Sequence, residues 1–333
     1  MPFRPDRISG PKYRYRLCGF SLISDTLIPE LGEPSGVACD SDHFIAIELG
    51  DVSGDVPEPS QWFLRQSLPD GLPWTARART RDGYFLRFHE FADFTIDRGG
   101  RHIKCVARRQ PASDLIIRAL LLDHVIPPVV ALRGRYVQHA AAVRTDATGV
   151  CVFAGDSGAG KSTIAAQLAA GGGDFLTDDC LVIDEQGGAV VAWSSHPSIK
   201  LRDDGIQFLK PGGDSEPVAE YTAKRRVPAS SFGTAFPLEP LPVARIYFLT
   251  RGDDDAAATS GPLIERLPLH AAFMKLVKHS IRLDSTDRAM LEREFHFTRR
   301  IVDSVPAALL SLPNDLSKLR LVRDAIAADL ALN

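Results

Sequence analysis

The hydrophobic residues in the N-terminal third of the chain occur in short runs. Aromatic and β-branched residues are frequent in these runs, and loops rich in Pro, Gly, Ser and Asp separate them. This pattern is typical of β-strands joined by turns. We therefore expect a small, mostly antiparallel β domain over residues 1–112, with strands near residues 13–24, 43–49, 84–88, 92–96 and 102–106.

The stretch that follows is apolar on all sides. Ser113 and Asp114 can cap a helix over residues 115–125, and a helix without a polar face is typically buried. Pro127 and Pro128 come next, and because proline normally interrupts a helix, we expect the helix to end before them. We find no apolar run that approaches the length needed to cross a bilayer, so we expect no membrane partner.

From residue 136 onward, strand patterns and helix patterns alternate. We predict a helix over residues 163–170 and strands over residues 136–143, 150–154, 180–184, 189–193 and 244–249. The runs 180–184 and 189–193 are joined by a short glycine turn, which predicts a hairpin. A plain doubly wound fold would place a helix between those strands. The expected architecture is therefore an α/β domain with a mixed sheet over residues 113–333.

The C-terminal part is predicted to be helical. One helix face holds Leu291, Phe295, Thr298 and Val302. A second predicted helix, which Asp315 can cap, has Leu316, Leu319, Val322, Ile326 and Leu330 on one face. We interpret both helices as packing elements.

Composition narrows the class of protein. The chain has 333 residues, of which 44% are hydrophobic and 24% charged, which is ordinary for a globular protein. A net charge of −3 without a dense Lys/Arg run argues against nucleic-acid binding. No C-x-x-C pair and no signal-peptide pattern occur, so we expect reduced thiols, no zinc site and a cytoplasmic location. The five cysteines are Cys18, Cys39, Cys105, Cys151 and Cys180.

The clearest chemical motif lies between the predicted strand 150–154 and the helix 163–170. It fits G-x-x-x-x-G-K-[ST], whose glycines let backbone N–H groups approach a phosphate. Lys161 can reach the β- and γ-phosphates of a nucleotide, and the Ser162 hydroxyl can ligate Mg²⁺. We expect ATP and Mg²⁺ as cofactors, with nucleotide contacts from Gly155, Asp156, Ser157, Gly158, Ala159, Gly160, Lys161, Ser162 and Thr163.

Two adjacent acids follow the motif. Asp178 and Asp179 end a short apolar run, where a carboxylate beside Mg²⁺ is typical. Neighbouring residues of a regular strand point to opposite faces, so both cannot have the same role, and one of them could instead cap a turn. Lys200, Arg202 and the basic cluster 224–226 could bind a phosphate or an acidic peptide, or could form a solvated charged face.

The order of His139, the loop 155–162 and the Asp178-Asp179 pair resembles the catalytic domain of the HPr kinase-related family. The resemblance covers residues 134–202 and implies a P-loop kinase domain of the HPr kinase/PEP carboxykinase type. It assigns the role of base to Asp178, and a place toward the metal to Asp179. His139 would orient Asp178 or contact the γ-phosphate.

The N-terminal part resembles the kinases of lasso-peptide biosynthesis, through its Tyr-rich first strand and Ser24-Asp25-Thr26-Leu27-Ile28-Pro29. This resemblance implies a serine kinase that acts on the C-terminal serine of a precursor peptide. The β domain would then have a peptide-binding role, and a homo-oligomer is left open. Two alternatives remain at this point: a P-loop ATPase or nucleotide-dependent regulator without a peptide acceptor, and a small-molecule kinase.

Overall fold

The computed structural model describes residues 12–34, 43–49, 59, 61–68, 70–108, 113–146, 149–251 and 261–332. The chain divides into two compact units. Unit 1 comprises residues 1–134 together with 282–290, and unit 2 comprises residues 135–281 together with 291–333. The architecture is mixed α/β with several sheets, as expected.

Unit 1 is built on a sheet that holds eight strands among the described residues, in the order β1-β2-β3-β8-β7-β6-β5-β4. The strands are β1 (Tyr13–Leu17), β2 (Phe20–Ser24), β3 (Phe44–Glu48), β4 (Trp62–Ser67), β5 (Pro73–Arg79), β6 (Gly83–Phe88), β7 (Ala92–Asp97) and β8 (His102–Ala107). The pairing is mostly antiparallel, although β3 runs parallel to both β2 and β8. The strands β4 and β5, in which Trp62 and Trp74 lie, are not among the predicted strands.

A long apolar helical segment follows this sheet. It consists of α1 (Asp114–Leu120), one π-helical turn (Leu121–Val125) and α2 (Ile126–Leu132). The expectation that Pro127 and Pro128 end the helix is wrong, because they occupy the first turn of α2, where proline removes no intrahelical hydrogen bond. The expectation that no apolar run is long enough to cross a bilayer is also wrong: Asp114–Leu132 is long and apolar enough, but 72% of its 18-residue apolar window is buried within the protein.

The helical segment belongs to unit 1 and not to unit 2. Arg118 pairs with Glu30, and the His124 ring lies against the rings of Trp74 and Phe88. The expected boundary at residue 112 therefore lies before the helices, whereas the compact units divide after Gly134. Local apolar patterns do not show which sheet a buried helix will cover.

Residues 282–290 also belong to unit 1, although they come late in the chain. Arg77 on β5 donates hydrogen bonds to the carbonyl oxygens of Arg282 and Leu283. Arg79 pairs with the buried carboxylate of Asp284. We call residues 282–290 the return segment.

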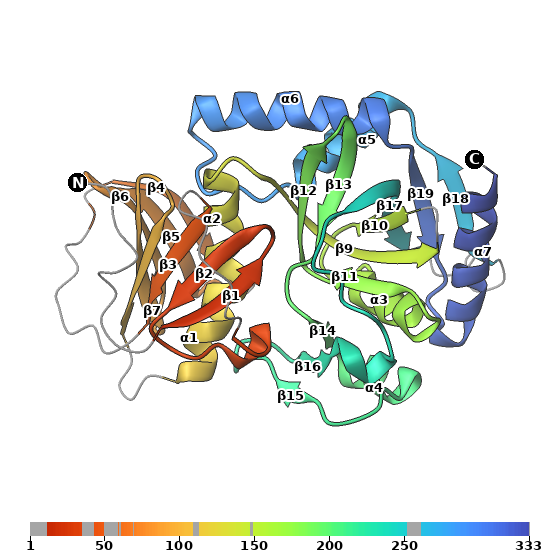
Figure 1. Ribbon diagram of the computed structural model, residues 1–333, viewed down its shortest axis with the longest axis horizontal. Helices are drawn as coiled ribbons and strands as arrows, with labels where there is room; N and C mark the ends of the chain where they lie inside the picture. The colour runs from red at the N-terminus through yellow and green to blue at the C-terminus, as the bar shows by residue number, and fades with distance from the viewer. Residues whose placement is uncertain are drawn as a thin grey trace. The chain divides into compact units, whose positions relative to one another are not determined.

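Unit 2 contains a second sheet, in the order β10-β9-β12-β13-β17-β19-β18, in which β10 also pairs with β17 (Figure 1). Its strands are β9 (Tyr136–Asp146), β10 (Gly149–Ala154), β11 (Asp174–Thr177), which pairs with β9, β12 (Cys180–Gln186), β13 (Ala189–Trp193), β17 (Leu241–Arg251), β18 (Leu263–Arg266) and β19 (Ala307–Leu312). The predicted β12–β13 hairpin is confirmed, and β10, β17 and β19 run parallel.

A small sheet and several helices complete unit 2. The sheet is formed by β14 (Ser198–Leu201), β16 (Arg225–Pro228) and β15 (Glu216–Pro217). The helices are α3 (Lys161–Ala170), α4 (Asp203–Leu209), α5 (Leu269–His279), α7 (Leu319–Ala331) and α6 (Arg288–Ser304), whose first three residues belong to unit 1. The interpretation of the C-terminal part as helical overlooked β19, a central strand.

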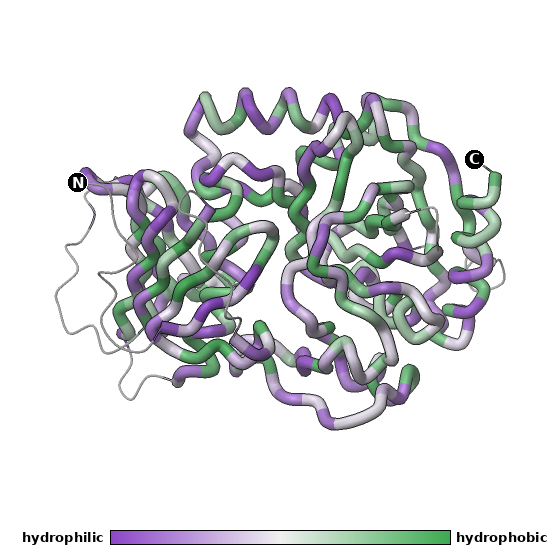
Figure 2. The backbone as a smooth tube through the Cα atoms, viewed as in Figure 1, coloured by the Kyte–Doolittle hydropathy of each residue, from purple (hydrophilic) through white to green (hydrophobic). Residues whose placement is uncertain are grey.

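Helices cover both faces of the large sheet of unit 2. Along β10, Cys151 and Phe153 contribute to a core shared with α3 and α7, whereas Val150 and Val152 contribute to a core shared with α5 and α6. This period of two places alternate residues on opposite faces. The central strands are buried on both faces, and hydrophobic positions follow much of this sheet (Figure 2). The sheet therefore holds its strand ends in fixed positions.

Candidate active site

The glycine-rich loop follows β10 and leads into α3, as the motif predicts. Gly158 and Gly160 have φ angles of 82° and 100°, a region that glycine enters without strain. The ammonium group of Lys161 is buried under the loop and donates to the carbonyl oxygens of Gly155, at 2.8 Å, and Asp156, at 3.1 Å. Burial lowers the pKa of Lys161.

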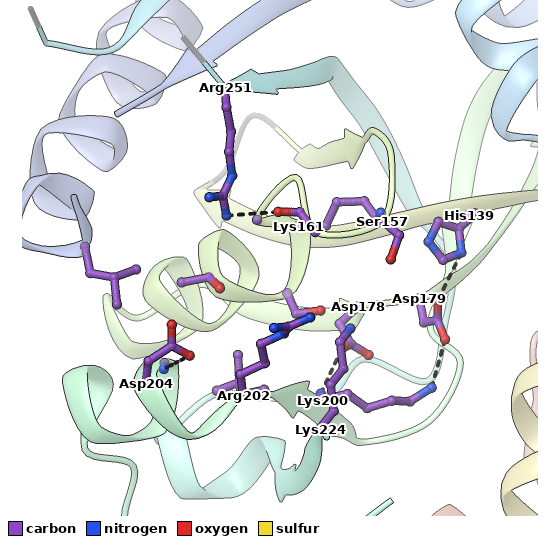
Figure 3. Close-up of a pocket in the computed structure, with 17 residues that line it drawn as sticks. His139, Ser157, Lys161, Asp178, Asp179, Lys200, Arg202, Asp204, Lys224 and Arg251 are labelled. Carbon is purple, nitrogen blue, oxygen red and sulfur yellow. Dashed lines mark hydrogen bonds and ion pairs between the residues drawn. The ribbon is translucent and has the colours of Figure 1, made fainter. Parts of the chain in front are cut away.

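The loop borders a cavity of about 610 Å³ (Figure 3). Most of the residues singled out in the sequence line this cavity: His139, Ser157, Gly158, Gly160, Lys161, Ser162, Thr163, Asp178 and Asp179. Three lie elsewhere. Gly155 is at the base of the loop, Ala159 faces a second, smaller cavity, and the exposed Asp156 pairs with Lys278 of α5 at 2.7 Å. The structure therefore brings the loop, the histidine and the acid pair to one place.

The acid pair lies in the short connection between β11 and β12. The expectation of regular strand geometry does not apply, because β11 ends at Thr177 and β12 begins at Cys180. The hydroxyl of Thr177 accepts a 3.3 Å hydrogen bond from the Asp179 N–H and stabilises this turn. His139 on β9 lies directly opposite Cys180 in the sheet, which places its ring beside Asp179.

The two carboxylates have different surroundings. Asp179 is partly exposed, and its oxygens lie 3.1 Å from Nδ1 of His139 and 2.8 Å from Nζ of Lys200. Asp178 is 2% exposed. Its Oδ2 accepts from the Lys200 N–H at 2.8 Å, and its buried Oδ1 has no hydrogen-bond partner. One acid is therefore held by cations, and the other is enclosed.

These surroundings move the two pKa values apart. Burial raises the pKa of Asp178 above its ordinary value. Burial acts in the same direction on Asp179, but the charge of Lys200 and the hydrogen bond with His139 outweigh it and hold the pKa of Asp179 well below its usual range. Asp179 is therefore anionic at neutral pH, and Asp178 binds a proton more readily than an ordinary aspartate.

Basic side chains line the cavity opposite the loop. Lys200 on β14 is buried, and Arg202 and Lys224 stand at the same wall. Arg225, the middle residue of the predicted basic cluster, instead binds Ser215. The structure thus places Lys200, Arg202 and Lys224 at the cavity, and this arrangement suits an anionic ligand.

Five further residues line the cavity without having been singled out for a site in the sequence: Leu201, Asp204, Gly205, Arg251 and Leu316. Arg251 is the last described residue of β17, and its Nη2 donates to the Gly158 carbonyl at 2.9 Å (Figure 3). A long-range pairing of β17 with β10 creates this contact, so no local pattern near Arg251 could have shown it. Leu316 was recognised only as part of a helix face.

The donors at the cavity fit a single Mg²⁺ ion. In the described part of the chain, no group of three or more His, Cys, Asp or Glu residues could hold a metal. Mg²⁺ requires fewer protein ligands, because it keeps several waters and binds phosphate oxygens of a nucleotide. Ser162 and Asp179 border the same cavity, and the pKa of Asp179 is held well below its usual range, which favours the anionic form that binds a cation.

The fold and the site define a class: an α/β protein with a mixed sheet, in which a glycine-rich strand–loop–helix turn borders a charged cavity. No family model matches the sequence, and no curated protein matches it. Among solved structures, the chain is distantly similar to the HPr(Ser) kinase/phosphatase from Coxiella burnetii. The TM-score is 0.32 at 11% sequence identity, over 59% of this chain and 93% of that one.

Proposed function

We propose that this protein is an ATP- and Mg²⁺-dependent serine kinase, which transfers the γ-phosphate of ATP to a serine hydroxyl of a peptide or small protein. One observation carries the proposal: a single cavity is lined by the loop residues Lys161 and Ser162 and by the adjacent acids Asp178 and Asp179. Phosphoryl transfer requires a cradle for the phosphates and a carboxylate at the acceptor hydroxyl.

The loop supplies the phosphate cradle. The helix α3 begins directly after the loop, and the positive end of the helix favours an anion there. Lys161 is bonded to two carbonyl oxygens, which are weaker partners for an ammonium than phosphate oxygens are. A bound triphosphate would therefore draw the ammonium toward its β- and γ-phosphates.

Ser162 and Asp179 would hold Mg²⁺. The ion, when bound, neutralises charge that develops on the phosphates. Asp179 suits this place because its pKa is low and its carboxylate is partly exposed to the cavity. Lys200 bonds the same carboxylate and would stand beside the transferred phosphoryl group.

Asp178 would accept the proton of the serine hydroxyl. Its raised pKa makes it the better proton acceptor of the two acids, and its Oδ1 is unpartnered. Its burial means that the acceptor must displace neighbouring atoms to reach it. The reverse assignment, with the more exposed Asp179 at the hydroxyl, predicts that substitution of Asp179 removes transfer without changing the Mg²⁺ requirement.

The acceptor that we propose is the C-terminal serine of a lasso-peptide precursor. The support is the resemblance of residues 24–29 to the motif of such kinases. In unit 1 these residues also have structural contacts: Asp25 accepts a hydrogen bond from the Leu49 N–H at 2.9 Å, and the Ile28 N–H donates to the Tyr15 hydroxyl at 2.8 Å. The sequence resemblance, and not these contacts, supports this acceptor.

A transfer assay tests the proposal. The protein would be incubated with Mg·ATP and a synthetic precursor peptide that ends in serine, and in parallel with the same peptide ending in alanine. We expect mass spectrometry to find one phosphoryl group on the terminal serine of the first peptide and none on the second. Release of ADP without a phosphopeptide would favour a P-loop ATPase or nucleotide-dependent regulator. Phosphorylation of a small molecule alone would favour a small-molecule kinase.

A further inference from the structure

Three parallel strands of unit 2 end at one edge of the sheet. Ala154 ends β10, Arg251 ends β17 and Leu312 ends β19, and Arg251 and Leu312 lie opposite each other in the pairing. Ligands of sheets with parallel strands bind outside the carboxyl ends of those strands. A nucleotide whose phosphates bind after β10 therefore has the ends of β17 and β19 beside it.

Both neighbouring strand ends touch the phosphate loop. The Arg251 guanidinium donates to the Gly158 carbonyl at 2.9 Å. A Cβ atom placed on Gly160 would lie 3.3 Å from Cδ1 of Leu312, which shows how closely the end of β19 approaches the loop. The segment after β19 is thus part of the surroundings of the loop.

A second cavity lies at this edge. It encloses about 50 Å³ and shares four lining residues with the large cavity: Gly160, Thr163, Arg251 and Leu316. The two cavities are therefore adjacent, and a molecule held by its phosphates in the larger one reaches the smaller one. The enclosed volume is smaller than a purine ring system, so one edge of a bound ring would stay in solvent.

The lining has the chemistry of a base-binding slot. Leu312, Pro313 and Leu316 form an apolar wall. Arg251 carries an exposed planar guanidinium, a group that stacks on aromatic rings. Asn314, also in the lining, has both a donor and an acceptor in its side chain, as the edge of a purine requires.

We propose that the purine base of the bound nucleotide lies between Arg251 and residues 312–316, with Asn314 at the edge of the base. This inference rests on the proposed function, because the phosphates must occupy the glycine-rich loop. It extends that function by naming where the base is bound and which residues distinguish one base from another. The acceptor peptide then uses the opposite wall of the large cavity, which Lys200 and Lys224 line.

The subsite can be tested by measuring the affinity of the protein for two ligands by calorimetry. Mg·ATP carries a base, whereas Mg·tripolyphosphate offers the phosphates alone. We expect Arg251→Ala to weaken ATP binding roughly tenfold, the size of a stacked cation–π contact, and to change tripolyphosphate binding by less than about twofold. Arg251→Lys should fail to restore ATP binding, because lysine keeps the positive charge but lacks a planar guanidinium group that can stack on the base. Arg320→Ala, at an exposed arginine that lines a separate cavity, is the control for loss of charge.

Asn314→Ala supplies a second measurement, the ratio of ATP to GTP affinity, which we expect to change severalfold. If Arg251→Ala lowered the affinities for Mg·ATP and Mg·tripolyphosphate equally, and Arg251→Lys restored both, Arg251 would act on the phosphates alone. That result would overturn the subsite. An unchanged ATP/GTP ratio in Asn314→Ala would remove Asn314 as the reader of the base. If the unaltered protein bound neither ligand, the proposed function would itself fail, which separates that failure from the failure of the subsite.

Discussion

Asp178 and Asp179 are neighbours in the chain but have opposite electrostatic surroundings. The turn between β11 and β12 directs Asp179 toward His139 and Lys200 and leaves Asp178 enclosed. Pairs of titratable groups whose pKa values are driven apart often mark acid and base roles. The difference arises because the turn between β11 and β12 meets β9 and β14, which supply His139 and Lys200 as partners of Asp179.

Replacement of the enclosed acid separates binding from transfer. We expect Asp178→Asn to lower the rate of phosphopeptide formation by about 10²–10⁴-fold, which is the usual contribution of a general base. Its affinity for Mg·ATP should stay close to that of the unaltered protein, because the loop is intact. The rate is measured by mass spectrometry and the affinity by calorimetry.

Asp179→Asn is the matched variant. It should raise the Mg²⁺ concentration needed for half-maximal rate, because it removes a ligand of the ion. If Asp179→Asn abolished transfer at saturating Mg²⁺ while Asp178→Asn transferred normally, the roles of the two acids would be reversed.

The same pair predicts opposite effects of pH on stability. The pKa of Asp178 is raised in the folded protein, so its favourable contribution holds at low pH and is lost as pH rises through the folded pKa. The pKa of Asp179 is lowered, so its contribution holds above the ordinary pKa and is lost as pH falls.

Urea denaturation at pH values on both sides of about 4, the ordinary pKa of aspartate, measures both contributions, because that of Asp179 changes below this pH and that of Asp178 above it. Relative to the unaltered protein, Asp178→Asn should gain stability as pH rises, and Asp179→Asn should lose it. Parallel pH profiles for the two variants would contradict the assigned pKa directions.

At the scale of elements, local patterns predicted the segments that are determined by local chemistry. The strand–loop–helix turn around Lys161 and the hairpin of β12 and β13 agree with their sequence patterns. β19 was missed because its six residues lie among helices and form an apolar run, which periodicity cannot assign to strand or helix. Its partner β17 is distant in the sequence, and only the assembled sheet identifies it.

The same limit applied to the site. His139, the loop and the acid pair are close in sequence and were identified together. Arg251 and Leu316 come from distant segments and join the cavity only through the parallel pairing of β10, β17 and β19. The acid pair lines the cavity, but its turn geometry was not predicted, because β11 and β12 are separated by only two residues.

The contribution of β19 to the free energy of unfolding can be measured by shortening one of its core side chains. Leu310 is fully buried in the core that α3 and α7 share. We expect Leu310→Ala to lower the free energy of unfolding by about 2–5 kcal/mol, as deletion of a buried leucine usually does. Leu263→Ala on the neighbouring β18, at a side chain that is 53% exposed, should change it by less than about 1 kcal/mol. Equal effects in urea denaturation would contradict the central place of β19.

At the scale of the whole molecule, neither unit is formed by one continuous stretch of the chain. The return segment supplies Asp284, which is fully buried and accepts hydrogen bonds from Arg79 and from the N–H and hydroxyl of Thr286. Its backbone also pairs with Arg77. Unit 1 therefore depends on residues that follow most of unit 2 in the sequence.

Loss of this anchor should destabilise unit 1. We expect Asp284→Ala to cost about 1–3 kcal/mol, because it removes a buried carboxylate that accepts three hydrogen bonds, and hydrogen bonds to charged groups are the stronger ones. Amide hydrogens of β5 should exchange faster, which hydrogen exchange with mass spectrometry would detect. Asp303→Ala removes a half-exposed partner of Arg299 and should change stability by less than about 1 kcal/mol. Unchanged exchange in β5 would show that the return segment does not support it.

The interrupted course of the chain limits how this protein can be divided. The polypeptide passes from unit 1 to unit 2 after Gly134, comes back at Arg282 and leaves again after Met290. A fragment that stops at Gly134 would lack nine residues of its own unit, and a fragment that starts at Arg135 would carry those nine as a foreign insert. Neither unit can be cloned as one uninterrupted reading frame, so a transplant of unit 2 into another protein would need a short linker in place of residues 282–290.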